Sequence, residues 1–150
     1  MRKFLLPIIN LVNVILVSIT FGLAKLSGAS DVSLTHEPPL PNFYNLVWGH
    51  QEVANAVGIV GFFLFVFAVA LTVVGFIPMK SRKYIVGTAG AMYIAAGVLF
   101  LLTPQNYCYG NETTVLELSG SLIAMAVLVF VAGALSIGML ALELTEKKEK

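Results

Sequence analysis

Four long apolar stretches fill most of this 150-residue chain, and their interiors contain no Asp, Glu, Lys, Arg or His. They cover residues 4–24, 53–77, 84–103 and 118–142. A helix rises about 1.5 Å per residue, so about 20 apolar residues cross a bilayer core of about 30 Å. We therefore expect four transmembrane helices. The first stretch exceeds the about 7 to 15 apolar residues of a cleaved signal peptide, so we expect it to be retained.

The composition agrees with a membrane protein. The chain is 58% hydrophobic and 11% charged, whereas a soluble domain is about half apolar and about a quarter charged. Its net charge of +1 gives no basic surplus of the kind that binds nucleic acid. The single cysteine, Cys108, excludes an intrachain disulfide.

The charges that flank the stretches predict the orientation. Eight of the nine basic residues fall on one side of the membrane, and only Lys25 falls on the other with five of the eight acids. Because basic flanks stay cytoplasmic, we expect both termini in the cytoplasm. The topology-setting residues are Arg2, Lys3, Lys80, Arg82 and Lys83, and the tail adds Lys147, Lys148 and Lys150 on the same side.

We expect one domain over residues 1–150, an all-α membrane protein built as an antiparallel, left-handed four-helix bundle. The outer loops are expected at about 25–52 and 104–117, the basic inner loop at 78–83, and a charged cytoplasmic tail at 143–150. Short connections make neighbouring helices antiparallel, and a repeat of small residues near 3.5 favours a left-handed bundle. The expected location is the plasma (cytoplasmic) membrane.

Small residues predict the faces on which the helices pack, because close backbone approach is a main source of association in lipid. In the second stretch the small face runs through Ala54, Gly58, Gly61, Phe65, Ala68, Thr72 and Gly75. In the third it runs through Gly87, Gly90, Ala91, Ile94 and Gly97. In the fourth it runs through Gly120, Ala124, Val127, Val131, Ala134, Gly138 and Ala141.

Asn10 and Asn13 are the most polar side chains expected at membrane depth, one turn apart in the first stretch. Two interpretations fit them. They either bind a polar substrate or ion, or they form hydrogen bonds between helices, which are worth about 0.6 to 2 kcal/mol. We favour the second, so both are expected on the packing face of the first helix, with Val17, Thr20 and Ala24.

Aromatic residues gather at the expected outer interface. Phe43, Tyr44 and Trp48 precede the second stretch, and Tyr107 and Tyr109 follow the third. Rings at headgroup level form the aromatic belt of many membrane proteins. A sharper interpretation makes residues 42–49 a short amphipathic cap over the bundle, which offers a docking surface.

The first outer loop also carries His36, Glu37, His50 and Glu52. Two histidines with carboxylates are able to bind zinc, but these residues do not form a helical His-x-x-x-His pair, so we expect no metal, no cofactor and no catalytic residue. The residue types present give no phosphate loop, nucleophile elbow or two-cysteine motif.

Three functions remain open. The favoured one is a non-catalytic integral membrane protein, acting as an accessory subunit, assembly factor or scaffold, with membrane lipids and another membrane protein or copies of itself as partners. The first alternative is a small oligomeric transporter or channel for a neutral or small polar solute. The second alternative is an outer-face membrane enzyme that uses His36, Glu37, His50 and Glu52 of the first outer loop.

Overall fold

The computed structural model describes residues 4–26, 43–48, 55–104, 107–109, 112–114 and 120–146. These residues form four long helices, one short helix and one pair of short strands. The elements in chain order are α1 (Leu5–Leu26), α2 (Phe43–Trp48), α3 (Ala56–Val74), α4 (Arg82–Leu102), β1 (Tyr107–Tyr109), β2 (Glu112–Thr114) and α5 (Gly120–Glu146).

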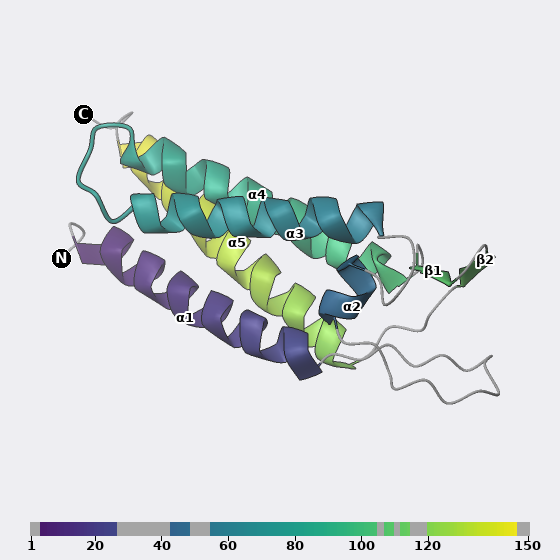
Figure 1. Ribbon diagram of the computed structural model, residues 1–150. Coiled ribbons are helices and arrows are strands. Elements are labelled where there is room, and N and C mark those ends of the chain that lie inside the picture. The colour runs from purple at the N-terminus through teal and green to yellow at the C-terminus, as the bar shows by residue number, and fades with distance from the viewer. Residues whose placement is uncertain are drawn as a thin grey trace.

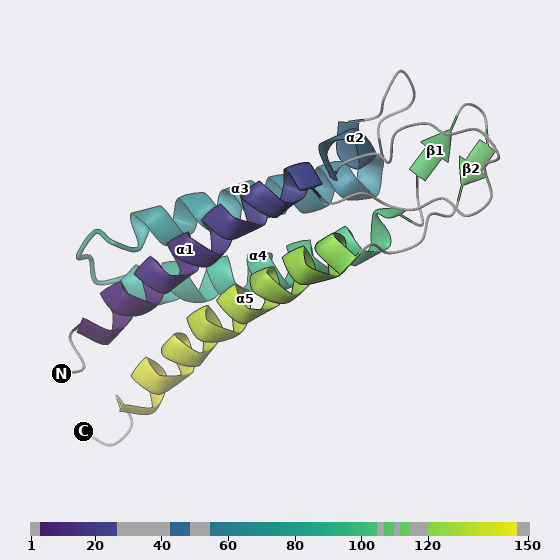
Figure 2. The same cartoon turned by 90° about the horizontal axis from the view of Figure 1, so that it is seen from below.

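The helices α1, α3, α4 and α5 are each long and apolar enough to cross a membrane, so the chain is a multi-pass membrane protein by length and composition. Figures 1 and 2 place the start of α1, the α3–α4 link and the end of α5 at one end of the bundle. The short helix α2 and the strand pair lie at the other end. These two groups of segments are called the terminal end and the α2 end below.

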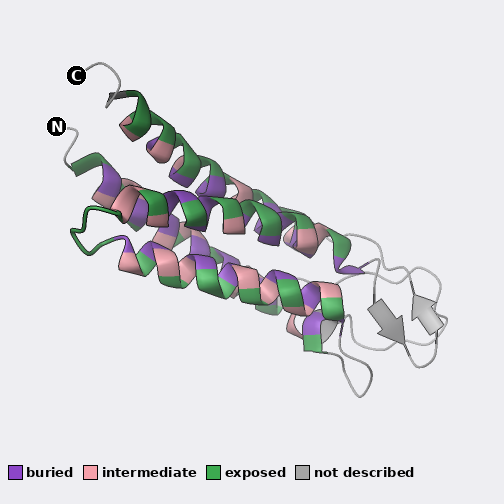
Figure 3. Ribbon diagram, turned by 90° about the horizontal axis from the view of Figure 1, so that it is seen from above, coloured by how far each residue is buried: buried purple, intermediate pink, exposed green. Residues whose placement is uncertain are grey.

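Helix α4 lies at the centre of the packing. It contacts α3 along one side and α5 along another, while α1 packs mainly on α5 and touches α3 less. Within an 18-residue apolar window of each span, 44% of the residues are buried in α4 and α5, against 28% in α1 and α3. Figure 3 shows buried and exposed positions alternating around each long helix. The chain therefore leaves much apolar side-chain surface facing outward, as a protein surrounded by lipid does.

The helix ends differ by a few residues from the limits expected from hydropathy. Helix α3 begins after Asn55, whose side chain accepts a hydrogen bond from the Gly58 N–H at 3.3 Å, the pattern of an N-cap. Helix α3 ends in a tighter turn just before Pro78, in which the Phe76 N–H donates to Val73 O at 3.1 Å. Helix α5 continues to Glu146, because the charged residues beyond 142 suit a helix once it leaves the lipid.

The α2 end holds two elements outside the four apolar stretches. Helix α2 covers most of the segment expected to form a cap, and it packs on α1 and α3. The strands β1 and β2 pair antiparallel, with Cys108 opposite Thr113, and no pattern in the sequence predicted them. Both elements sit where the chain passes between long helices.

Candidate functional site

Polar side chains gather inside the half of the bundle nearest the terminal end. Asn10 and Asn13 of α1 are fully buried, as are Thr72 of α3 and Ser136 of α5. The Asn13 Nδ2 atom donates to Ser136 Oγ at 2.8 Å, which ties α1 to α5. The Asn13 Oδ1 atom has no hydrogen-bond partner in the described part of the chain.

Asn10 lies against the end of α3. A Cβ atom built on Gly75 would lie 2.9 Å from Asn10 Nδ2 and 3.0 Å from the Val86 side chain, so the glycine makes room for the amide. Neither Nδ2 nor Oδ1 of Asn10 has a partner among the described residues. An unpaired buried amide is unfavourable by about 1 to 3 kcal/mol. The cluster therefore holds three unpaired polar atoms, on Asn10 and Asn13.

A second polar contact joins α3 to α4. The Thr72 Oγ1 and Tyr93 OH atoms lie 2.8 Å apart, and both residues are buried. The Thr72 hydroxyl also donates to Ala68 O at 2.9 Å within its own helix. A hydroxyl carries one proton, so Tyr93 is the donor of the pair. The two contacts join α1 to α5 and α3 to α4 through neutral groups.

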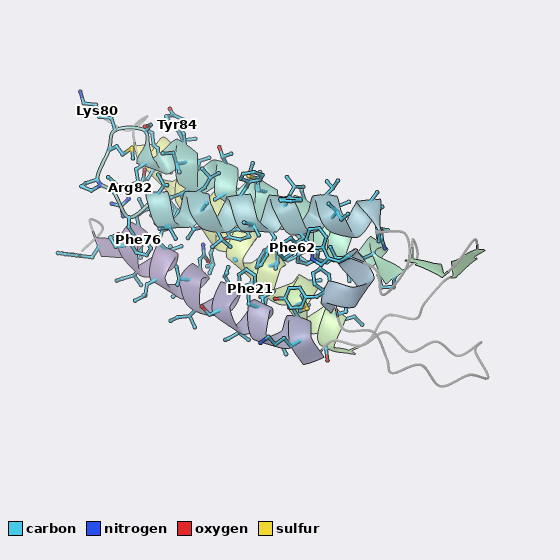
Figure 4. The ribbon with its side chains drawn as sticks, viewed as in Figure 1. Phe21, Phe62, Phe76, Lys80, Arg82 and Tyr84 are labelled. Carbon is cyan, nitrogen blue, oxygen red and sulfur yellow. The ribbon has the colours of Figure 1, made fainter. Side chains whose placement is uncertain are left out.

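Aromatic rings fill the other half of the bundle interior. Phe65 lies 5.1 Å from Phe21 and 5.6 Å from Phe100 between ring centroids, and Phe100 lies 4.8 Å from Phe43. Figure 4 shows the labelled Phe21 and Phe62 near α2. A hollow of about 10 Å³ remains beside these rings, lined without polar surface. That volume is about enough for one water molecule, so this hollow is too small for a substrate.

Asn55 holds the α2 end together. Besides its cap of α3, its backbone N–H donates to Val47 O of α2 at 3.1 Å. Its Nδ2 atom donates to Thr103 O at the end of α4, at 2.7 Å. One buried residue thus joins three elements, which fixes α2 over the aromatic interior.

The expected docking aromatics divide between two roles. Phe43 is 1% exposed, so it belongs to the core, and the expectation that it lines a docking surface needs correction. Its position follows from the geometry of α2, where residues 43 and 47 lie on one face four positions apart. Tyr44 is half-buried and Trp48 is exposed. Tyr107 and Tyr109 lie in β1, and their side chains are outside the described part.

The glycines expected on the packing faces of α3 and α4 lie in the interior of the bundle. Gly58 faces the Thr103 and Val47 side chains, and Gly61 faces Leu99. On α4 the three expected glycines all meet α5: Gly87 contacts Leu140, Gly90 contacts Ile137 and the Gly133 carbonyl, and Gly97 contacts Phe130. Gly75 of α3 makes room for the Asn10 amide. Ala91 and Ile94 of α4, by contrast, are exposed.

The small face expected on α5 points away from the chain, which corrects the prediction for Ala134 and Gly138. All seven of its positions are exposed, and a Cβ on Gly138 would meet no atom within 4 Å. The physical reason is that α5 carries a second face of the same period, which meets α1 and α4. We call the exposed set the α5 outer stripe: Gly120, Ala124, Val127, Val131, Ala134, Gly138 and Ala141.

Four residues that organise the interior were not predicted from the sequence: Asn55, Tyr93, Gly133 and Ser136. Asn55 carried a usable signal, since Asn is a favoured N-cap residue. Ser136 and Gly133 are ordinary small residues in an apolar helix. Ser136 and Gly133 differ from the small residues of the α5 outer stripe only in lying on the buried face of the helix.

Several other expected residues lie outside the described part of the chain. They are Arg2, Lys3, Ala54, His36, Glu37, His50 and Glu52. Of the basic inner loop, Lys80 is exposed, and Arg82 and Lys83 are half-buried at the start of α4. Within the described residues, no three His, Cys, Asp or Glu side chains come together.

Comparison with known proteins adds no relative: no family model, curated protein or solved structure matches this chain.

Proposed function

We propose that this chain is a non-catalytic membrane protein that works by contact with another membrane protein, as an accessory subunit, assembly factor or scaffold. We place it in the plasma (cytoplasmic) membrane as a single antiparallel, left-handed bundle with both termini in the cytoplasm. The orientation rests on the basic flanks of the helices, and the membrane location rests on their four apolar spans. The contact is the central claim.

The observation that carries the proposal is the outward position of the α5 outer stripe. Seven exposed residues follow alternating steps of 4 and 3 along about six turns of one helix. Small residues at a helix surface let a second backbone approach closely, which is how membrane helices associate without a hydrophobic drive. A glycine at 138 is not required for packing within the chain, because its added Cβ would meet nothing.

The occupant that we assign to this stripe is a transmembrane helix of a different membrane protein. Larger exposed side chains, Ile123 and Ile137, line one edge of the stripe. A partner helix with its own small face would fit along the stripe beside this edge, with a crossing near 20°. A second copy of the chain is the alternative occupant, which mass determination distinguishes.

The test is the mass of the complex after gentle extraction of the tagged chain from its own membrane. We expect the wild-type chain with one further protein, and about tenfold less complex for Gly138→Leu, since bulk at the stripe keeps the helices apart. Gly22→Leu is the matched control, because Gly22 of α1 is also exposed and its Cβ would meet nothing. A wild-type chain that is extracted alone would contradict the proposal.

A transporter or channel for a neutral solute is the second candidate. The three unpaired polar atoms of Asn10 and Asn13 favour it, because polar groups at membrane depth often bind a substrate. The ring contacts among Phe21, Phe65 and Phe100 count against a polar path through one chain. Uptake of a labelled neutral solute by liposomes containing the pure protein would favour this candidate over the first.

A further inference from the structure

The α3–α4 link, residues 75–81, presents apolar and basic side chains together at the terminal end. Phe76, Ile77 and Met79 are 40%, 54% and 39% exposed. Lys80 follows directly, and in Figure 4 its side chain points away from the bundle. A surface that combines exposed apolar groups with cations is suited to the boundary between headgroups and acyl chains.

Two cations beside the link are held in place. The Arg82 Nε atom donates to Gly75 O at 2.5 Å, so the guanidinium is fixed on the end of α3. The Lys83 Nζ atom lies 5.2 Å from the ring centroid of Tyr84, within the range of a cation–π contact. Side chains that are already ordered lose less entropy when a ligand binds. Arg82 and Lys83 therefore form an ordered basic surface, and the exposed Lys80 lies beside it.

The start of α4 adds to the positive field. Ser81 occupies the N-cap position but makes no side-chain cap bond, and the first turn contains no acid. The N-terminus of a helix carries a partial positive charge that Asp or Glu usually offsets. No Asp or Glu occurs between residues 53 and 111. Glu143 and Glu146 end α5 at this same end, but over the whole sequence the basic residues on this side outnumber the acids eight to three.

We propose that the α3–α4 link is a docking surface for an acidic phospholipid. The phosphate group would lie between Lys80, Lys83 and the start of α4, with Arg82 neutralising the carbonyl end of α3 beside it. Phe76, Ile77 and Met79 supply the contacts for acyl chains, which a free phosphate ion does not use. Charge complementarity selects the acidic lipid over a zwitterionic one. This surface is separate from the α5 outer stripe and does not rest on the proposed function.

Native mass spectrometry of the full chain in mild detergent tests this proposal. The probe is an equal mixture of phosphatidylglycerol and phosphatidylcholine with identical acyl chains. We expect the wild-type chain to retain phosphatidylglycerol preferentially, and each of Lys80→Gln and Lys83→Gln to lower that preference about fivefold. Lys25→Gln is the matched control, since Lys25 is exposed at the α2 end and should leave the preference unchanged. The measurement does not depend on orientation in a membrane.

A second arm separates a lipid site from a general charge effect. The preference should fall as sodium chloride is raised, because exposed charges are screened. Equal retention of the two lipids by the wild-type chain would overturn the proposal, and so would an equal loss in Lys25→Gln. Inorganic phosphate that binds as tightly as phosphatidylglycerol would also overturn it, since the acyl-chain contacts would then contribute nothing. An unchanged unfolding midpoint verifies that the variants are folded.

Discussion

Gly90 of α4 and Gly133 of α5 face each other backbone to backbone. A Cβ added to either residue would lie 2.9 Å from the carbonyl oxygen of the other. Real Cβ atoms essentially never come so near, so alanine at either position would push the helices apart. This reciprocal contact lies at the centre of the most extensive helix pair in the chain.

Alanine substitution at two glycines of α5 should have opposite effects. Gly133→Ala should lower the free energy of unfolding by about 1 to 3 kcal/mol, because backbone must move. Gly138→Ala should leave it unchanged or raise it by about 0.5 to 1 kcal/mol, since alanine is the better helix former and the site is open. Unfolding of the isolated chain with SDS in mixed micelles measures both. Equal effects would show that the Gly133 contact is not tight.

The comparison of α3 with α5 explains what the sequence could and could not predict. On α3 the stripe from Gly58 to Gly75 is buried, and bulky residues such as Phe63 and Phe67 lie off it and are exposed. On α5 both faces carry small residues with the same period, so spacing alone cannot say which face meets the chain. Side-chain volume predicts the buried face of α3, whereas on α5 the buried face carries Leu122, Met125 and Met139 and the smaller residues lie outward.

The four long helices followed from hydropathy, because the length of an apolar run is a direct requirement of the bilayer. The contacts of Asn55 with Val47 and Thr103 did not follow, since they join residues of three elements that lie up to 48 positions apart in the sequence. Asn10 was expected inside, and it is buried. Its lack of a partner depends on the shape of the α3 end, which hydropathy does not encode.

Asn55→Ala should destabilise the α2 end. The substitution removes both the cap of α3 and the 2.7 Å hydrogen bond to Thr103 O. We expect it to lower the free energy of unfolding by about 1 to 2 kcal/mol. Asn55→Ser should recover the cap portion, because Ser is a good N-cap residue but is too short to reach Thr103. Hydrogen exchange at the first turn of α3 reports the cap directly. A serine variant as unstable as the alanine variant would contradict the assigned cap.

The two asparagines of α1 should respond differently to substitution. Asn13→Ala removes the hydrogen bond to Ser136, and a double-mutant cycle with Ser136→Ala should give a coupling of about 0.6 kcal/mol, at most about 1.7. Asn10→Leu should be neutral or stabilising, because it replaces an unpaired buried amide with an apolar group of similar size. A cycle between Asn10 and Ser136 is the control and should give no coupling. A large loss in Asn10→Leu would mean that the amide has a partner in the membrane.

The hydrogen bond between Tyr93 and Thr72 should contribute to the α3–α4 pair. Tyr93→Phe removes the hydrogen-bond donor and keeps the ring contact with Phe65. We therefore expect the free energy of unfolding to fall by about 0.6 to 2 kcal/mol. Thr72→Val should cost a similar amount, and the double variant should cost little more than either alone. Additive losses, measured by the same SDS unfolding, would show that the two hydroxyls act independently.

Photo-crosslinking along α5 in the native membrane tests the central claim most directly. A photoreactive amino acid is placed at Val127, Ala134 and Ala141 of the α5 outer stripe, and at Val60 and Phe67 as exposed controls on α3. Our account predicts a crosslink to one other membrane protein from all three stripe positions, and crosslinks to lipid alone from the α3 positions. Lipid crosslinks alone from the stripe, or protein crosslinks of equal yield from both helices, would contradict it.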